Sequence, residues 1–532
     1  MMPWHVLNVY SKILKESTKT IIMHAYVLSH DVGTSSVKSA LVRSDGAVVA
    51  HRTAHYSFQY PQPGWVEQEP EDYWKGIVKN TRQIVETNQE QISQLCGMVF
   101  STQAMGVIPV DKNGKCLYSN ITWVDGRAEE EAQWLMRLVG GKRIFTSLIG
   151  VELTGKDVVA KLRWLKNKKL EIYQNTDTIL DVNGWLKYKA TGKKVAEWSG
   201  ACSYGFDLKK KDWERLLFKV AGLDINKFPD LVRSTDKVGT LTPESAEELG
   251  LPVDTLVFGG CDDTQSAAMG SGAAKEGDTH IYLGTSAWAG ITTSKNLKHK
   301  NGAAVLQSAD PTSNLIVGIT ESAGSNLEWL IDNFYKEEKA NPDIPNIYDF
   351  INQETEEVPQ GSEHLIFTPW LLGERCPVSS TTTRGTLFNI GLEHSRAHMV
   401  NALLEGIGFN LKWIFENFER DFKYAANHIR AIGGGSTNEK WMQGIANITG
   451  KRVETITEPT MAGAIGAAAC VFVGSGVYKS FDELDSLIKV DQVFEPSEES
   501  RKVFDELFQS YKELYRELKD VYDRLNRKRL NK

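Results

Sequence analysis

The chain opens with short segments in which apolar and polar residues alternate, the pattern that half-buried β-strands show. This alternation predicts strands at residues 26–31, 36–43 and 47–59, with a Ser44-Asp45-Gly46 hairpin turn between the second and the third. Residues 71–88 instead carry apolar side chains three and four positions apart, which indicates an amphipathic helix. The apolar run Leu95–Ser101 predicts one more strand, so the first half follows the order β-β-β-α-β.

The second half of the chain repeats this order. Strands are predicted near 279–284, 287–293 and either 303–308 or 314–319, followed by a helix near 323–335 and a strand at Leu365–Thr368. Further elements are a helix near 395–418, a strand at His428–Ile432 and helices near 438–449 and 461–473. The last helix carries one apolar stripe, which we expect to pack on its own domain: Phe504, Leu507, Phe508, Tyr511, Leu514, Leu518, Val521 and Leu525.

The duplicated order predicts an α/β protein with mixed sheets and two domains that meet near Gly270–Gly277. Two common nucleotide-binding folds are disfavoured. No G-x-G-x-x-G follows a predicted strand, and no G-x-x-x-x-G-K-[ST] occurs in the sequence.

Composition narrows the class of protein. A chain of 532 residues exceeds what one hydrophobic core usually supports. Its net charge of −7 argues against a nucleic-acid or anionic-membrane binder. Six widely spaced cysteines without a C-x-x-C pair favour reduced thiols over disulfides or zinc, which predicts a cytoplasmic protein. The uncharged stretch at residues 461–478 is short for a membrane span and predicts an interior helix.

The turn at Gly33–Ser36 follows a carboxylate, Asp31, at the end of the first predicted strand. Backbone N–H groups and hydroxyls in such a turn can bind an anion, and the carboxylate can hold Mg²⁺ beside it. A similar turn, Gly284-Thr285-Ser286, separates the two strands of residues 279–293. Two such hairpins facing each other would form a nucleotide site. The alternatives are ordinary hairpin turns and, for Asp31, an Asx turn.

With both hairpins placed, the chain resembles the FGGY carbohydrate kinases from about residue 25 to residue 476. The motifs occur in the family's order: Asp31-Val-Gly-Thr-Ser-Ser36, Gly64–Trp74, Trp123-Val-Asp-Gly-Arg127, Gly259–Gly270, Leu283–Ser286, Leu372–Pro377, Arg384-Gly-Thr-Leu387, Leu403–Gly406 and Gly433–Ser436. Each motif is weak alone, and the ordered set is specific. The resemblance implies a two-domain actin-like ATPase (ribonuclease H-like) fold with an interdomain catalytic cleft.

The resemblance also divides the chain. We expect an N-terminal extension at residues 1–23, a sugar-binding and base-carrying domain at 24–272, an ATP-binding domain at 273–495 and a C-terminal amphipathic helix at 496–532. The cofactors it implies are ATP and Mg²⁺, with Asp31 orienting the metal through water.

Asp262 matches the family's general base, which takes the proton of a sugar hydroxyl. It follows the small-residue turn Gly259-Gly260-Cys261, which lets the backbone bring the carboxylate into the cleft. A helix N-cap is the alternative role for Asp262, and the two roles can coexist. We expect Asp263 either to bind another sugar hydroxyl or to be solvated.

The resemblance places the β- and γ-phosphates among Gly33, Thr34, Ser35, Gly284, Thr285 and Ser286. Adenosine is expected at Gly434, Gly435 and Ser436, where glycines let a base lie against the backbone and a helix begins, with Asn438 as a further candidate. A flexible strand-to-helix loop is the alternative. Sugar candidates are Gln103, Met105 and Trp123 with Asp125, then Trp65 and Glu67; for the tryptophans core packing is the alternative.

The expected reaction is phosphorylation of a ketopentose such as xylulose. Gln103-Ala-Met-Gly106 lacks the histidine of the Gln-Met-His-Gly motif that xylulose-phosphorylating members usually carry. Ribulose, gluconate, glycerol or another polyol therefore stays open as the acceptor, as does a non-catalytic actin-like nucleotide-binding module. The expected partner is a small sugar or polyol, not nucleic acid or a membrane, and a homodimer is left open.

Overall fold

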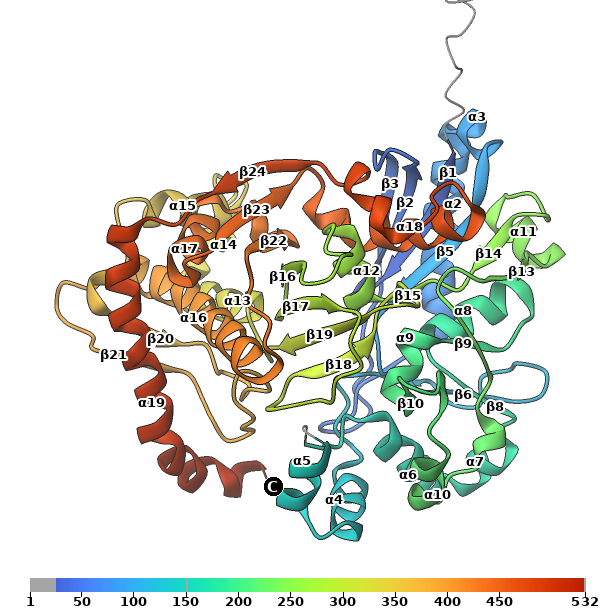
Figure 1. The fold of residues 1–532 in the computed structure, drawn as a ribbon, viewed down its shortest axis with the longest axis horizontal. Helices are drawn as coiled ribbons and strands as arrows, with labels where there is room; N and C mark the ends of the chain where they lie inside the picture. The colour runs from blue at the N-terminus through green and yellow to red at the C-terminus, as the bar shows by residue number, and fades with distance from the viewer. Residues whose placement is uncertain (1–24, 150–151, 531–532) are drawn as a thin grey trace, which may run out of the picture.

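The computed structural model describes residues 25–149 and 152–530, so the extension predicted at residues 1–23 lies outside the described residues. Two mixed sheets stand side by side, each with helices against it (Figure 1). The first is built from β1 (Tyr26–Val32), β2 (Ser36–Arg43), β3 (Val48–His55), β5 (Leu95–Thr102), β13 (Lys237–Thr240), β14 (Leu256–Phe258) and β15 (Cys261–Asp262).

In the first sheet β1 runs antiparallel to β2 and parallel to β5, and β15 also pairs with β5 in parallel. The predicted β-β-β-α-β order is confirmed, with helix α2 at Pro70–Thr87. The third strand ends at His55 and not at residue 59. Its partner β2 begins at Ser36, opposite His55, so the pairing of these two strands ends there, and Gln59 instead forms an isolated bridge with Glu67.

A subdomain without strong periodicity in the sequence is inserted between β5 and β13. Its helices are α4 (Glu129–Leu138), α5 (Lys142–Ile149), α6 (Val158–Lys168), α7 (Leu170–Asn175), α8 (Val182–Thr191), α9 (Trp198–Ala201) and α10 (Arg215–Ala221). The short helix α3 (Gln89–Ile92) precedes β5, and α11 (Pro243–Leu249) follows β13. Its short strand pairs are β6 (Ile108–Val110) with β8 (Thr178–Leu180), β9 (Val195–Glu197) with β12 (Asp230–Val232), and β10 (Phe206–Asp207) with β11 (Asp212–Trp213). Its β7 (Asn120–Ile121) pairs with β4 (Glu67–Gln68), which precedes α2 in the chain.

The second sheet repeats the first. It contains β16 (Thr279–Leu283), β17 (Ala287–Thr293), β18 (Ala304–Gln307), β19 (Asn314–Ile319), β22 (His428–Ile432), β23 (Arg452–Ile456) and β24 (Val490–Phe494). Both of the alternative third strands predicted near 303–308 and 314–319 are therefore present. The remaining elements are α13 (Gly324–Phe334), α14 (Lys336–Ala340), α15 (Ile347–Thr355), β20 (Ile366–Thr368), β21 (Thr386–Phe388), α16 (Arg396–Phe422) and α17 (Glu439–Thr449).

Two helices rich in small residues join the halves. α12 (Asp263–Gly270) and α18 (Ala462–Ser475) pack against each other between the two sheets (Figure 1). A Cβ on Gly270 would lie 1.8 Å from the carbonyl oxygen of Ala462, and one on Gly466 would lie 1.8 Å from that of Ser266. Only glycine fits at these two positions. The prediction of an interior helix at residues 461–478 is confirmed, because α18 is buried along most of its length.

The C-terminal helix α19 (Glu498–Leu530) packs on the second half, as its apolar stripe predicts. Phe504, Leu507, Phe508 and Tyr511 form a cluster with side chains that include Trp370 and Phe409, although Leu525 farther along is exposed. Nowhere in the described part of the chain is a helix long and apolar enough to cross a membrane. The described residues include all six cysteines, and each thiol is free.

Candidate active site

Parallel pairing brings three candidate residues to one edge of the first sheet. Asp31 on β1 lies opposite Ser101 on β5, and Asp262 on β15 lies opposite Thr102, the last residue of β5. Gln103 follows directly, and its N–H donates to the Val32 carbonyl oxygen at 2.8 Å. Ligand sites in open α/β sheets form where the carboxyl ends of such parallel strands meet.

Asp31 lies where the two halves of the chain touch. Its Oδ1 accepts a hydrogen bond from Ser101 Oγ at 3.1 Å. Its Oδ2 would lie 2.6 Å from a Cβ on Gly463, so the carboxylate is seated against the first turn of α18. Burial raises the pKa of Asp31, while the positive charge of Lys38 on β2 opposes that shift.

Asp31 suits Mg²⁺, because magnesium prefers carboxylate oxygens and keeps several waters. In the described residues no group of three or more His, Cys, Asp or Glu side chains could hold a metal by itself. The donor set therefore fits an ion shared with substrate phosphates, which is how Mg²⁺ usually binds in phosphoryl-transfer sites.

Asp262 occupies the N-cap position of helix α12, but its carboxylate makes no capping hydrogen bond. The residue is 4% exposed, and its N–H donates to Ser199 Oγ at 3.0 Å. Burial, followed by the negative charges of Asp181, Asp263 and Glu197, raises the pKa of Asp262 well above its usual value, and Lys187 opposes this. A buried carboxyl with a raised pKa and no capping partner suits a proton acceptor.

The neighbouring Asp263 interacts electrostatically with Asp31, the other carboxylate of the site. Its pKa is raised to about 7, first by burial and then by the charge of Asp31. Thr264 Oγ1 donates to Asp263 Oδ1 at 3.2 Å. Asp263 therefore lies within electrostatic range of Asp31.

The first glycine turn, Gly33-Thr34-Ser35, links the sheet to the inserted subdomain. The N–H of Gly33 donates to the carbonyl oxygen of Ser36 at 3.0 Å, which closes the turn. Gln68 Nε2 donates to the Thr34 carbonyl oxygen at 2.8 Å, and Trp123 Nε1 donates to Thr34 Oγ1 at 3.1 Å. Trp123, a sugar candidate, thus contacts a phosphate candidate directly.

The second turn, Gly284-Thr285-Ser286, joins β16 to β17 and rests on the start of α13. The Gly284 N–H donates to the Ser286 carbonyl oxygen at 3.0 Å, and the Gly324 N–H donates to that of Gly284 at 2.9 Å. A Cβ on Gly284 would lie 2.4 Å from the ring of Tyr282. Burial raises the pKa of Tyr282, and the charges of Asp31 and Asp263 raise it further. Tyr282 therefore lies close both to the second turn and to the acids of the first half, Asp31 and Asp263.

The glycine run after β22 lies beside the second turn, because β22 pairs with β16 in parallel. Gly433 has φ +89°, and a Cβ there would lie 2.6 Å from the Leu283 carbonyl oxygen. A Cβ on Gly434 would meet nothing within 4 Å, so this backbone borders open space. Asn438 caps α17 through the Trp441 N–H at 2.8 Å, donates to Asn352, and lines a cavity with Glu405 and Lys440.

The sugar candidates Gln103 and Met105 lie in the loop after β5. Gln103 Nε2 donates to Gln68 Oε1 at 2.9 Å, while the buried Oε1 of Gln103 has no hydrogen-bond partner among the described residues. Met105 has φ +62°, a left-handed conformation that is uncommon for a residue with a side chain. Such strain occurs preferentially at binding sites.

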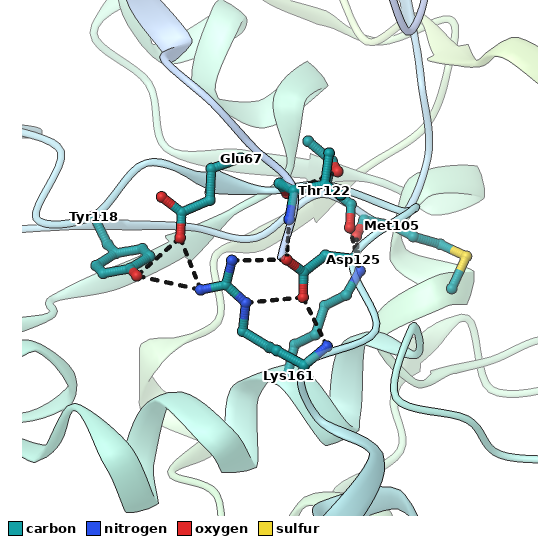
Figure 2. A network of polar contacts seen from close by, with 8 residues as sticks. Glu67, Met105, Tyr118, Thr122, Asp125 and Lys161 are labelled. Carbon is teal, nitrogen blue, oxygen red and sulfur yellow. Dashed lines mark hydrogen bonds and ion pairs between the residues drawn. The ribbon is translucent and has the colours of Figure 1, made fainter. Parts of the chain in front are cut away.

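A buried polar network underlies this loop (Figure 2). Arg127 pairs with Glu67 at 2.8 Å and with Asp125 at 2.7 Å, and its guanidinium stacks 3.9 Å from the ring centre of Trp65. Lys161 donates to the carbonyl oxygens of Met105 at 3.2 Å and Thr122 at 2.7 Å. Three of the sugar candidates, Trp65, Glu67 and Asp125, are thus engaged with Arg127.

Sequence reasoning missed the buried cations of this region. Burial lowers the pKa of Lys161 to about 7, and Lys187 is likewise fully buried on helix α8. One signal was available for Lys161: it lies four residues after Asp157 within an otherwise apolar run. For Lys187 the apolar neighbours Trp185 and Leu186 gave a similar but weaker indication.

Two repeated sheets, paired glycine turns and a cluster of buried acids define a phosphotransferase of the actin-like class. The N-terminal domain of the FGGY family of carbohydrate kinases matches residues 26–270, and the C-terminal domain of that family matches residues 280–475. The chain therefore belongs to the FGGY family of carbohydrate kinases. The family, the fold class and the enzyme class expected from the sequence are confirmed.

Several relatives match this chain over nearly its whole length. The xylulose kinase of Bacillus subtilis is 29% identical over 512 residues, which cover 95% of this chain and all of that protein. A gluconokinase of the same organism is 26% identical, covering 94% of this chain and 98% of its own. The crystal structure of ligand-bound xylulose kinase from Lactobacillus acidophilus superposes with a TM-score of 0.84 at 23% identity, covering 94% of this chain and 99% of that one.

Proposed function

We propose that this chain transfers the γ-phosphoryl group of ATP to a hydroxyl of a neutral ketopentose such as xylulose, with Asp262 as the general base. One observation carries the proposal: Asp262 is buried at the carboxyl end of β15, beside β5, and leaves its helix uncapped. A pure nucleotide-binding module has no need of such a base, which argues against the non-catalytic alternative.

In the proposed reaction the acceptor hydroxyl gives its proton to Asp262, and its oxygen attacks the γ-phosphorus. The bond from that phosphorus to the β,γ-bridging oxygen breaks, and ADP leaves. The turns at Gly33–Ser35 and Gly284–Ser286 direct N–H groups and hydroxyls at the phosphates. Mg²⁺ near Asp31 would neutralise charge on the phosphates. Gly434, Gly435, Ser436 and Asn438 would hold adenosine.

The polar groups around the sugar candidates favour a neutral acceptor. Buried oxygen atoms of Gln103, Asn120 and Thr102 have no partner among the described residues, and sugar hydroxyls can donate to them. The nearby cations are committed, because Arg127 pairs with two carboxylates and Lys161 donates to two carbonyl oxygens. An aldonate such as gluconate would bring a carboxylate that neither Arg127 nor Lys161 is free to receive. Asp263, Met105 and Trp123 are proposed to line the same site.

The gluconokinase relative makes gluconate the competing acceptor. Steady-state ADP release should therefore be measured with xylulose, ribulose, glycerol, gluconate and no acceptor at equal enzyme concentration. We expect the highest kcat/KM with a ketopentose, at least about tenfold above gluconate, because a buried charge left unpaired is costly. A preference for gluconate would overturn the neutral-acceptor assignment. ATP binding without acceptor-dependent ADP release would favour the non-catalytic module. A cytoplasmic location stays a prediction from the sequence, and a homodimer stays open.

A further inference from the structure

Helix α8 is hydrogen-bonded to the turn that precedes the proposed base, Asp262. Asn183 and Lys187 are four residues apart and so lie on one face of the helix. Lys187 Nζ donates to the Gly259 carbonyl oxygen at 3.1 Å. Asn183 Nδ2 donates to the carbonyl oxygens of Phe100 at 3.0 Å and Cys261 at 3.3 Å. Both ends of the Gly259-Gly260-Cys261 turn are therefore bound to α8.

The opposite side of this turn is closed by backbone. A Cβ on Gly259 would lie 2.1 Å from the carbonyl oxygen of Arg233, and one on Gly260 would lie 2.1 Å from that of Phe100. The turn is thus confined between α8, β5 and the segment before β13. Any change in the Lys187 contact would be transmitted to the residue that follows the turn, which is Asp262.

Lys187 also brings charge to a cluster of acids. Asp262 Oδ1 and Asp181 Oδ2 lie 3.3 Å and 2.4 Å from the position that a Cβ on Gly200 would take, so both carboxylates border this glycine. Ser199 Oγ donates to Glu197 and accepts from the Asp262 N–H. The titratable and charged groups that act on Asp262, or on which it acts, are Asp181, Lys187, Glu197, Cys202, Tyr204, Cys261 and Asp263.

Among these groups Lys187 supplies the cation. Asp181, Asp263 and Glu197 raise the pKa of Asp262, and Lys187 lowers it. Conversely, Asp181, Glu197 and Asp262 raise the pKa of Lys187 against the effect of burial. A fully buried ammonium group needs such partners, since an isolated buried charge is very unfavourable.

We propose that Lys187 is a positioning residue for the general base, fixing the turn before Asp262 and placing a positive charge among the acids that surround this turn. The inference rests on the proposed function, because it assumes that Asp262 accepts the sugar proton. Lys187 itself does not touch the reacting atoms.

The pH dependence of kcat/KM tests this role, because its acid limb reports the ionisation of the base in the free enzyme. In Lys187→Met the side chain keeps its approximate length and loses its charge. We expect the acid limb to move upward by at least about one pH unit, with kcat at pH 7 at least about tenfold lower and partial recovery at higher pH. Lys193→Met, an exposed lysine just beyond α8, should leave the limb unchanged.

Two further variants separate charge from structure. Asn183→Leu removes the hydrogen bonds from α8 to Phe100 and Cys261 without changing charge. It should lower kcat without moving the acid limb of the pH profile. Asp181→Asn keeps a good helix N-cap residue but removes one negative charge beside Asp262, so the limb should move downward. Asp181→Asn therefore tests the effect of nearby charge on Asp262 even if Lys187→Met does not fold.

An unmoved limb in a folded Lys187→Met enzyme, or in Asp181→Asn, would overturn the inference. Its failure is distinguishable from failure of the proposed function. If Asp262→Asn abolishes turnover while Lys187→Met leaves the limb unmoved, only the role of Lys187 is wrong. If Asp262→Asn retains turnover, the general base itself is misassigned.

Discussion

The substitution Asp262→Asn is expected to lower kcat on the order of 10²–10⁴-fold, the range that a positioned general base contributes. Asparagine has nearly the same shape, so the start of α12 should be preserved, because Asp262 makes no side-chain capping bond. An amide cannot accept the proton of the sugar hydroxyl at neutral pH. Calorimetric titration should therefore find ATP and xylulose bound nearly as tightly as by the unsubstituted enzyme.

The matched control is Asp254→Asn, the same change at an exposed residue of the same half. It should leave kcat and both affinities unchanged. Near-normal turnover in Asp262→Asn would reject the assignment of the base. A loss of sugar binding that accounts for the whole decrease would instead give Asp262 a binding role.

The substitution Asp31→Asn is expected to weaken the apparent affinity for Mg²⁺ about 10–100-fold, the usual effect of removing a group that orients a metal through water. The amide oxygen can still accept from Ser101 Oγ, so the fold at the end of β1 should persist. The charge that attracts the cation is lost. kcat at saturating ATP and low Mg²⁺ should decrease accordingly and recover in part as Mg²⁺ is raised.

Calorimetry with a non-hydrolysable ATP analogue, titrated at several Mg²⁺ concentrations, gives a readout independent of turnover. Asp45→Asn, in the half-buried turn between β2 and β3, is the control and should leave the Mg²⁺ dependence unchanged. An unchanged Mg²⁺ dependence in Asp31→Asn would assign Asp31 a purely structural role at the interface with α18.

The framework of the fold was predictable because it depends on local patterns. Alternation and a Gly-containing turn specify each hairpin, so the bounds of β1, β2, β16 and β17 agree with prediction within one residue or two. The stretch from residue 103 to residue 236 was not assigned. Its strands have only two or three residues each, too short to show a period, and distant partners hold them in place.

The residues of the candidate site likewise include some that the local sequence reveals and some that only the fold brings together. Asp31 and the glycine turns carry their signal in adjacent residues, and could be selected from the sequence. The pairing of Arg127 with Glu67 spans 60 positions, and Lys187 reaches a carbonyl group 72 positions away. No short pattern encodes such contacts. A buried lysine resembles a surface lysine until the chain around it is folded.

The structure of the enzyme with a non-hydrolysable ATP analogue, Mg²⁺ and xylulose tests the central claim most directly. The account predicts the γ-phosphate between the Gly33–Ser35 and Gly284–Ser286 turns, and an Asp262 carboxylate oxygen about 2.6–3.2 Å from one sugar hydroxyl that faces the phosphorus. A triphosphate bound away from either turn, or a sugar whose hydroxyls all lie beyond hydrogen-bonding reach of Asp262, would contradict it.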